Sequence, residues 1–104
     1  MKVENAWYLV SSHGSILFYI AAFPDTTVKD IADAMSLTRR TVWGIIGDLR
    51  RKDMIDVRRD GRHHHYTVNL DGGVEFTHPI LQGIPLRAVL HEVISHFAAR
   101  PVVV

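Results

Sequence analysis

Two short helix-forming segments lie next to each other in the chain, with only a tight turn between them. The first follows Thr27 and runs to about Met35, and the second follows Thr38 and runs to about Lys52. Each threonine can cap the free N–H groups of the first helical turn. Apolar residues recur in both segments at the three- and four-residue spacing of an amphipathic helix. Because the joint is so short, the two helices must cross in contact, and small Ala32 lies where they would cross.

An alternating segment follows these helices. Residues 54–58 and 64–70 alternate apolar and polar side chains, as strands with one buried face do. Residues 59–62 connect them, and Gly61 can supply the positive φ of a hairpin turn. The pattern predicts an α+β fold that is mainly α: a helix-turn-helix over about 27–52, followed by a β-hairpin wing over about 54–70.

Apolar helices are predicted at both ends of the chain. One covers residues 7–23, is bent near Gly14 and is ended by Pro24, and the other covers about 84–99 and is stopped by Pro101. The length of 104 residues suits a single domain over 1–104. Packing within one chain explains part of the apolar surface of the two helices. The remainder favours a homodimer formed through the first and last helices.

The charge of the chain is unevenly distributed. The formal net charge is only +1, which by itself argues against a nucleic-acid partner. Residues 36–66, however, hold eight Lys and Arg against four Asp, whereas 1–35 hold two against four acidic residues and 67–104 hold two against three. A basic stretch of this kind is typical of a phosphate-binding face, although a solvated surface explains it equally well.

The run from Val28 to Leu49 resembles the winged helix-turn-helix regulators of the ArsR and MarR type. The following MIDVRRDGRHHHYTV resembles their wing, and HPILQGIPLRAVLHEVI resembles the last helix that many of them carry. The resemblance implies a prokaryotic, cytoplasmic, DNA-binding transcriptional regulator that acts as a homodimer. It places the recognition helix 38–52 in the major groove of double-stranded DNA and the wing 58–65 on the backbone or minor groove.

The same resemblance implies roles for individual positions. The N-terminal end of the second helix suits phosphate contacts, and Thr41 suits a phosphate or a base edge. Trp43 matches a base-facing position, with packing against the wing or a partner subunit as an equal alternative. The predicted DNA-binding residues are Thr38, Arg39, Arg40, Thr41, Trp43, Gly44, Gly47, Arg51, Arg58, Arg59, Arg62, His63 and His64.

Gly44 and Gly47 depart from the family pattern. They fall on the outward face of the recognition helix, where relatives commonly place longer polar or basic side chains. A glycine within a helix costs about 1 kcal/mol relative to alanine, so something must compensate. Close approach to a DNA backbone is one candidate and close contact with another protein is the second. The alternative function is therefore a protein-interaction module that uses the Trp43, Gly44 and Gly47 surface.

Seven histidines raise the possibility of a metal site, since some ArsR-like relatives sense metals. His63 and His65 share one face of a strand, with only Asp60 as a further ligand. His91 and His96 are five residues apart and do not stack. We therefore expect no metal and no cofactor, and interpret the wing histidines as solvated. Below about pH 6.5 they would add positive charge beside the arginines and raise DNA affinity.

Other classes of function find little support in the sequence. The chain lacks a nucleophile elbow, a glycine-rich phosphate loop and a carboxylate pair in an apolar run, so we expect no enzyme. The longest apolar run, 16–23, is too short to span a bilayer. A small-molecule effector between the first and last helices stays open, but no polar cluster there identifies a ligand.

Overall fold

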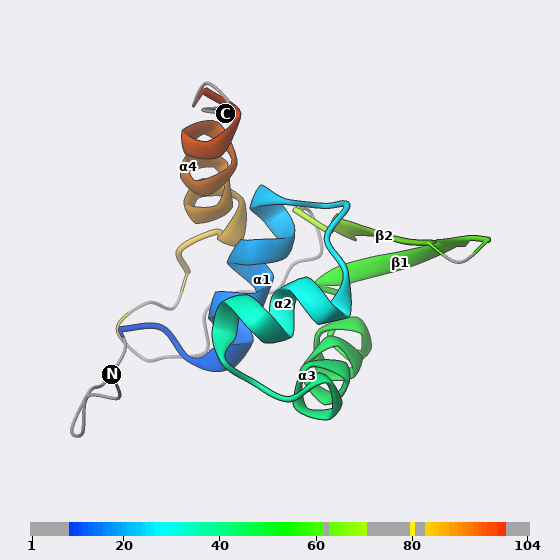
Figure 1. The fold of residues 1–104 in the computed structure, drawn as a ribbon. Coiled ribbons are helices and arrows are strands. Elements are labelled where there is room, and N and C mark those ends of the chain that lie inside the picture. Colours follow the sequence, from blue (N-terminus) through cyan, green and yellow to red (C-terminus); the bar gives the residue numbers. More distant parts are fainter. Residues whose placement is uncertain (1–8, 62, 71–79, 81–82, 100–104) are drawn as a thin grey trace.

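The computed structural model describes residues 9–61, 63–70, 80 and 83–99. In this part of the chain, four helices and a two-stranded antiparallel sheet follow one another: α1 (Ser12–Ala22), α2 (Val28–Met35), α3 (Arg39–Arg51), β1 (Ile55–Asp60), β2 (His63–Val68) and α4 (Leu86–Ala99). Figure 1 shows the hairpin projecting to one side of the helical body and α4 lying on the opposite side of α1 from α3. The predicted winged helix-turn-helix with an additional C-terminal helix is confirmed.

The first helix begins later than the sequence pattern predicted. The hydroxyl of Ser11 accepts a hydrogen bond from the N–H of Gly14 at 3.2 Å and caps α1, so the helix starts at Ser12. Leu9 precedes it in a bend and is 92% exposed. The cap sets the start of the helix because it satisfies a free N–H group of the first turn. Gly14 therefore lies in the first turn of α1. Trp7 is outside the described residues.

The helix-turn-helix has the predicted caps. Thr27 accepts from the N–H of Asp30 at 3.0 Å, and Thr38 accepts from the N–H of Thr41 at 3.1 Å. Between the helices, Ser36 takes the left-handed conformation with φ +56°, and the N–H of Leu37 donates to the carbonyl of Ala32 at 3.0 Å. A left-handed residue ends α2 abruptly and lets α3 leave at a steep angle.

One apolar core joins these elements. Its members come from the inward faces of all four described helices and from both strands, and they are Ile16, Leu17, Ile20, Ile31, Ala32, Val42, Ile45, Ile46, Leu49, Ile55, Tyr66, Leu86 and Leu90. The apolar residues that recur at helical spacing in α3 are Val42, Ile45, Ile46 and Leu49, and all four are buried. The core thus fixes which face of α3 remains outside.

The strands of the hairpin extend closer to its tip than predicted, and they are shorter at its base. β1 and β2 pair in antiparallel register from Ile55 opposite Val68 to Asp60 opposite His63, and Gly61 has φ +63° at the turn. The sequence pattern ended the first strand at 58 and began the second at 64. Cross-strand hydrogen bonds continue past those points because only Gly61 and its neighbour are needed to reverse the chain. Arg59 therefore lies within β1, and Arg62 lies outside the described residues.

The last helix begins at Leu86, two residues after the predicted start. Leu86 and Leu90 are buried, and the ring of Phe97 packs edge-on against Phe23 with centroids 5.1 Å apart. These contacts attach α4 to α1 (Figure 1). In the part of the chain that is described, no helix has the length and apolar character needed to cross a bilayer.

Candidate nucleic-acid interface

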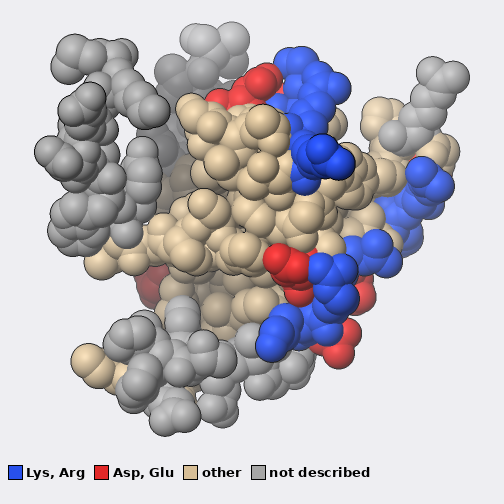
Figure 2. Space-filling view, turned by 90° about the horizontal axis from the view of Figure 1, so that it is seen from below, with Lys and Arg blue, Asp and Glu red and all other residues tan. Residues whose placement is uncertain are grey.

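Basic side chains gather on the side of the molecule where α3 lies. Figure 2 shows Lys and Arg in a band along one side of this face, with a few acidic side chains among them and an uncharged centre. All the described arginines of α3 and β1 are exposed. The segment that holds the positive charge of the chain is therefore presented to solvent and not folded inward.

The N-terminal turn of α3 carries two exposed arginines. Arg39 and Arg40 are exposed, and no acidic side chain among the described residues pairs with either guanidinium. Beside them, the hydroxyl of Thr38 donates to the hydroxyl of Thr41 at 2.9 Å. A helix N-terminus has a partial positive charge and free N–H groups. Together with two available guanidinium groups, it suits an anion such as a phosphate.

Trp43 packs against the wing. Its ring meets the ring of His64 edge-on, with centroids 5.7 Å apart and an interplanar angle of 75°, and 47% of the residue remains exposed. The sequence left open whether Trp43 faces the bases or packs against the wing or a partner subunit. In the structure, the covered part of the indole packs against the wing. Only the exposed remainder is available to a partner.

The two glycines of α3 have different surroundings. A Cβ atom at Gly44 would have nothing within 4 Å, whereas a Cβ at Gly47 would lie 3.2 Å from Nη1 of Arg51. No packing within the described chain requires Gly44 to lack a side chain. Among the described residues, therefore, no contact compensates for the destabilising effect of Gly44 on the helix.

Gly44→Ala is expected to raise the free energy of unfolding by about 0.5–1 kcal/mol, because alanine loses less backbone entropy in a helix and its methyl group enters open space. Urea unfolding followed by circular dichroism measures the change. Gly47→Ala is the matched control and is expected to gain less, since the Arg51 guanidinium must move. A less stable Gly44→Ala protein would contradict the open surroundings of Gly44.

Arg51 is turned toward its own helix. It forms an ion pair with Asp48, and Nε2 of His13 in α1 donates to the other oxygen of the same carboxylate at 2.8 Å. The hydrogen bond from His13, with a second one from Arg51, lowers the pKa of Asp48. Arg51 is thus exposed but paired, whereas no described residue forms an ion pair with Arg39 or Arg40, and Asp48 connects α1 to α3.

Asp48→Asn is expected to lower the thermal unfolding midpoint near pH 6. Because the pKa of Asp48 is lowered from 3.8 in the folded chain, the stability it contributes is present above about pH 4. This contribution to stability is lost as the pH falls through the lowered pKa of Asp48. The gap between the midpoints of the two proteins should therefore narrow as the pH falls below about 4. Identical midpoints at pH 6 would show that the pair does not stabilise the fold.

The wing histidines are not all solvated, contrary to the sequence interpretation. His63 is exposed, but His64 and His65 are half-buried. His64 packs on Trp43, and Nδ1 of His65 donates to Oδ1 of Asp25 at 2.9 Å. The interpretation failed because β2 lies against α3 and the connection between α1 and α2 instead of standing free in solvent. Arg58 and Arg59 lie directly across the hairpin from His65 and His64.

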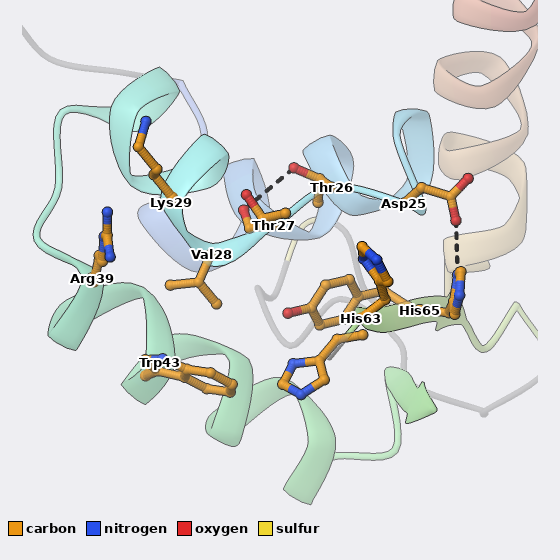
Figure 3. A pocket seen from close by; sticks show the side chains of 11 residues that line it. Asp25, Thr26, Thr27, Val28, Lys29, Arg39, Trp43, His63 and His65 are labelled. Atoms are coloured by element: carbon orange, nitrogen blue, oxygen red, sulfur yellow. Dashed lines mark hydrogen bonds and ion pairs between the residues drawn. The ribbon is translucent and has the colours of Figure 1, made fainter. Parts of the chain in front are cut away.

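A cavity of about 320 Å³ separates the start of α2 from α3 and β2. Figure 3 shows Lys29 and Arg39 at one end and His63 and His65 at the other, with Trp43 along one edge. Tyr66 also lines it, and the buried Tyr66 hydroxyl has no hydrogen-bond partner among the described residues. Burial raises the pKa of this phenol. A second cavity, of about 210 Å³, lies between α1, β2 and α4 and is mostly apolar.

Within the described ranges, no three His, Asp or Glu side chains come together as metal ligands do. The two histidine–carboxylate pairs of the structure are instead contacts between elements. Sequence reasoning missed both pairs, His13 with Asp48 and His65 with Asp25. The partners are 35 and 40 residues apart and no periodicity links them. Only the fold brings them together.

The comparisons with known proteins agree with this geometry. The model of the MarR family matches residues 11–64, just over half of the chain, and covers α1, the helix-turn-helix and most of the wing. The chain belongs to the MarR family. No curated protein sequence matches it. The MarR part of the sequence resemblance is confirmed, whereas the ArsR part finds no support.

Solved structures with the same fold include a MarR-like regulator from Staphylococcus aureus. MepR, a transcription regulator of the multidrug efflux pump MepA, superimposes with a TM-score of 0.56 at 23% identity, over 86% of this MarR-family chain and 58% of MepR. A MepR mutant from a multidrug-resistant clinical isolate gives 0.57 at 24% identity over 86% and 59%. A MepR mutant bound to an oligodeoxyribonucleotide gives 0.54 at 21% over 86% and 57%. The chain spans less than three fifths of the length of these proteins.

Proposed function

We propose that the chain is a DNA-binding transcriptional regulator and not an enzyme, and that it uses neither metal nor cofactor. The observation that carries the proposal is that the guanidinium groups of Arg39 and Arg40, at the N-terminus of α3 beside a basic wing, are exposed and form no ion pair with any described residue. Membership of the MarR family supports it, as does the likeness to a MepR mutant bound to an oligodeoxyribonucleotide. Membership of the MarR family also supports the proposal that the chain acts in the cytoplasm of a prokaryote.

In this proposal α3 enters the major groove, and residues 58–65 of the wing lie on the backbone or minor groove. Thr38, Arg39 and Arg40 contact phosphates, and Arg58 and Arg59 do so from the wing. The exposed part of Trp43 and the open surface at Gly44 allow α3 to approach the base edges closely. Sequence readout then depends on few side chains, so shape and phosphate contacts contribute much of the affinity.

We also propose that residues 1–104 form one domain and that two copies associate through α1 and α4. Large apolar side chains remain exposed on or next to these helices, at Leu9, Phe23, Ile84 and Phe97. A two-fold dimer would cover them and place two recognition helices about 34 Å apart, one turn of DNA. Sedimentation equilibrium at tens of micromolar should give twice the chain mass, and a monomer at that concentration would contradict the dimer.

A second candidate function is a protein-interaction module. It is favoured by one observation, the half-exposed Trp43 beside the open Gly44 on α3. Gel shift with sheared genomic DNA at low salt separates the two candidates. A regulator retards DNA at micromolar protein or below, since phosphate contacts alone give binding in this range. No shift at 50 mM salt would reject DNA binding and leave the module.

A further inference from the structure

Three successive residues of β2 are each attached to the helical body. Beginning near the base of the wing, the N–H of Tyr66 donates to the carbonyl of Pro24 at 3.1 Å. His65 donates to the carboxylate of Asp25 at 2.9 Å, and His64 packs on Trp43 with ring centroids 5.7 Å apart. The first two contacts reach the connection between α1 and α2, and the third reaches α3. The three contacts therefore follow one another along β2 toward the tip of the hairpin.

The two outer contacts lie opposite the wing arginines. In the register of the hairpin, His65 pairs with Arg58 and His64 pairs with Arg59. Directly paired residues of an antiparallel ladder are about 5 Å apart, so holding one fixes the backbone of the other. Contacts that fix the positions of His64 and His65 therefore also fix the backbone of Arg58 and Arg59, the proposed phosphate-contacting residues of β1.

An isolated two-stranded hairpin is marginally stable in water, because its few cross-strand contacts barely offset the entropy of ordering the chain. A wing that is already ordered loses less entropy when it meets DNA, and this raises affinity without any new contact. We propose that Asp25 and Trp43 are positioning residues: they hold the wing against the helix-turn-helix motif, through His65 and His64, so that Arg58 and Arg59 meet phosphate. The inference rests on the proposed DNA-binding function.

The charge of Asp25 allows a purely electrostatic role on DNA to be distinguished from a role in positioning the wing. Its side chain is 83% exposed, next to the basic wing. If Asp25 acted on DNA only through its charge, its removal would lessen repulsion from phosphate and raise affinity. If it anchors the wing, its removal lowers affinity. The two accounts predict opposite signs for the same variant.

The experiment compares the free protein with its DNA complex. In the free protein, hydrogen exchange by mass spectrometry should show several-fold faster exchange of the hairpin amides in Asp25→Ala and in Trp43→Ala, with an unchanged thermal midpoint. With a DNA fragment that the wild type binds, Asp25→Ala should bind about two- to fivefold more weakly, the range that an exposed pair allows. The slope of log affinity against log salt should also become shallower, although no cation has been removed.

Two further variants control for the loss of a negative charge and for the loss of the aromatic ring. Asp30→Ala removes the same charge from α2, where the side chain is exposed and makes none of the wing contacts, and it should bind DNA as tightly as wild type or more tightly. Trp43→Phe keeps an aromatic ring for His64 and should retain most of the affinity that Trp43→Ala loses. Hairpin exchange at the wild-type rate in Asp25→Ala and Trp43→Ala, or tighter DNA binding by Asp25→Ala, would overturn the proposal. A wild type that binds no DNA, together with faster hairpin exchange in the variants, would instead reject the proposed function.

Discussion

Replacing Arg40 and Arg59 together by alanine is expected to lower DNA affinity at least a hundredfold at 0.1 M salt. Each phosphate contact releases about 0.9 counterion, so at this salt the loss of one contact weakens binding about eightfold. The proposed dimer would lose the four proposed contacts, so the slope of log affinity against log salt should fall by about 3.6. Fluorescence anisotropy of a labelled duplex across 50–300 mM salt measures both quantities. Each arginine lies on a different element, α3 or β1, so the double variant tests the whole proposed face.

Arg87→Ala is the control for this experiment. It removes one positive charge per chain, against two in the double variant, from α4, which lies on the opposite side of α1 from the recognition helix (Figure 1). Its affinity should stay within about twofold of wild type and its salt slope should be unchanged. Equal losses for Arg87→Ala and the double variant would place the DNA elsewhere on the molecule.

Ile31→Ala is expected to lower the free energy of unfolding by about 2–5 kcal/mol. Ile31 has no exposed surface and is a central residue of α2, where it forms part of the core shared with α3 and the hairpin. Deleting three of its carbon atoms removes apolar contacts and leaves a cavity, because the surrounding helices relax only in part. For a chain of this length the thermal midpoint should fall by about 10 °C or more. Differential scanning calorimetry measures the change.

Ile80→Ala makes the same chemical change at a residue that is 82% exposed. It should alter the free energy of unfolding by less than about 0.5 kcal/mol, since little apolar surface becomes newly hydrated. Comparable losses for the two variants would mean that α2 is not packed as the structure shows.

The elements of the winged helix were predictable because their signals are local. Thr27 and Thr38 cap the helices that follow them, and the apolar spacing of α3 identified its four buried residues. The start of α1 was predicted wrongly because two local signals competed there. The apolar run before α1 favoured a helix from residue 7, but the cap at Ser11 set the start.

The contacts that shape the candidate interface were not predictable in the same way. The sequence identified Trp43 and the histidines of β2, yet it could not show that His64 lies on Trp43 or that His65 reaches Asp25. These pairs depend on how far the hairpin leans toward the helices. That lean is set by the buried Tyr66 and by its backbone bond to Pro24. Arg51, expected to face DNA, is instead paired with Asp48, and this contact is local because its partner is one turn away on the same helix.

Selection of genomic fragments by the purified chain, followed by sequencing, tests the central claim most directly. The chain is mixed with sheared genomic DNA, bound fragments are recovered over several rounds, and the Arg40→Ala, Arg59→Ala double variant is carried through in parallel. The wild type should enrich a small set of fragments that share a two-fold symmetric sequence with half-sites about one DNA turn apart, and the double variant should enrich none. Recovery of unselected DNA by both proteins, or of no DNA by either, would contradict a sequence-specific regulator that binds through α3 and the wing.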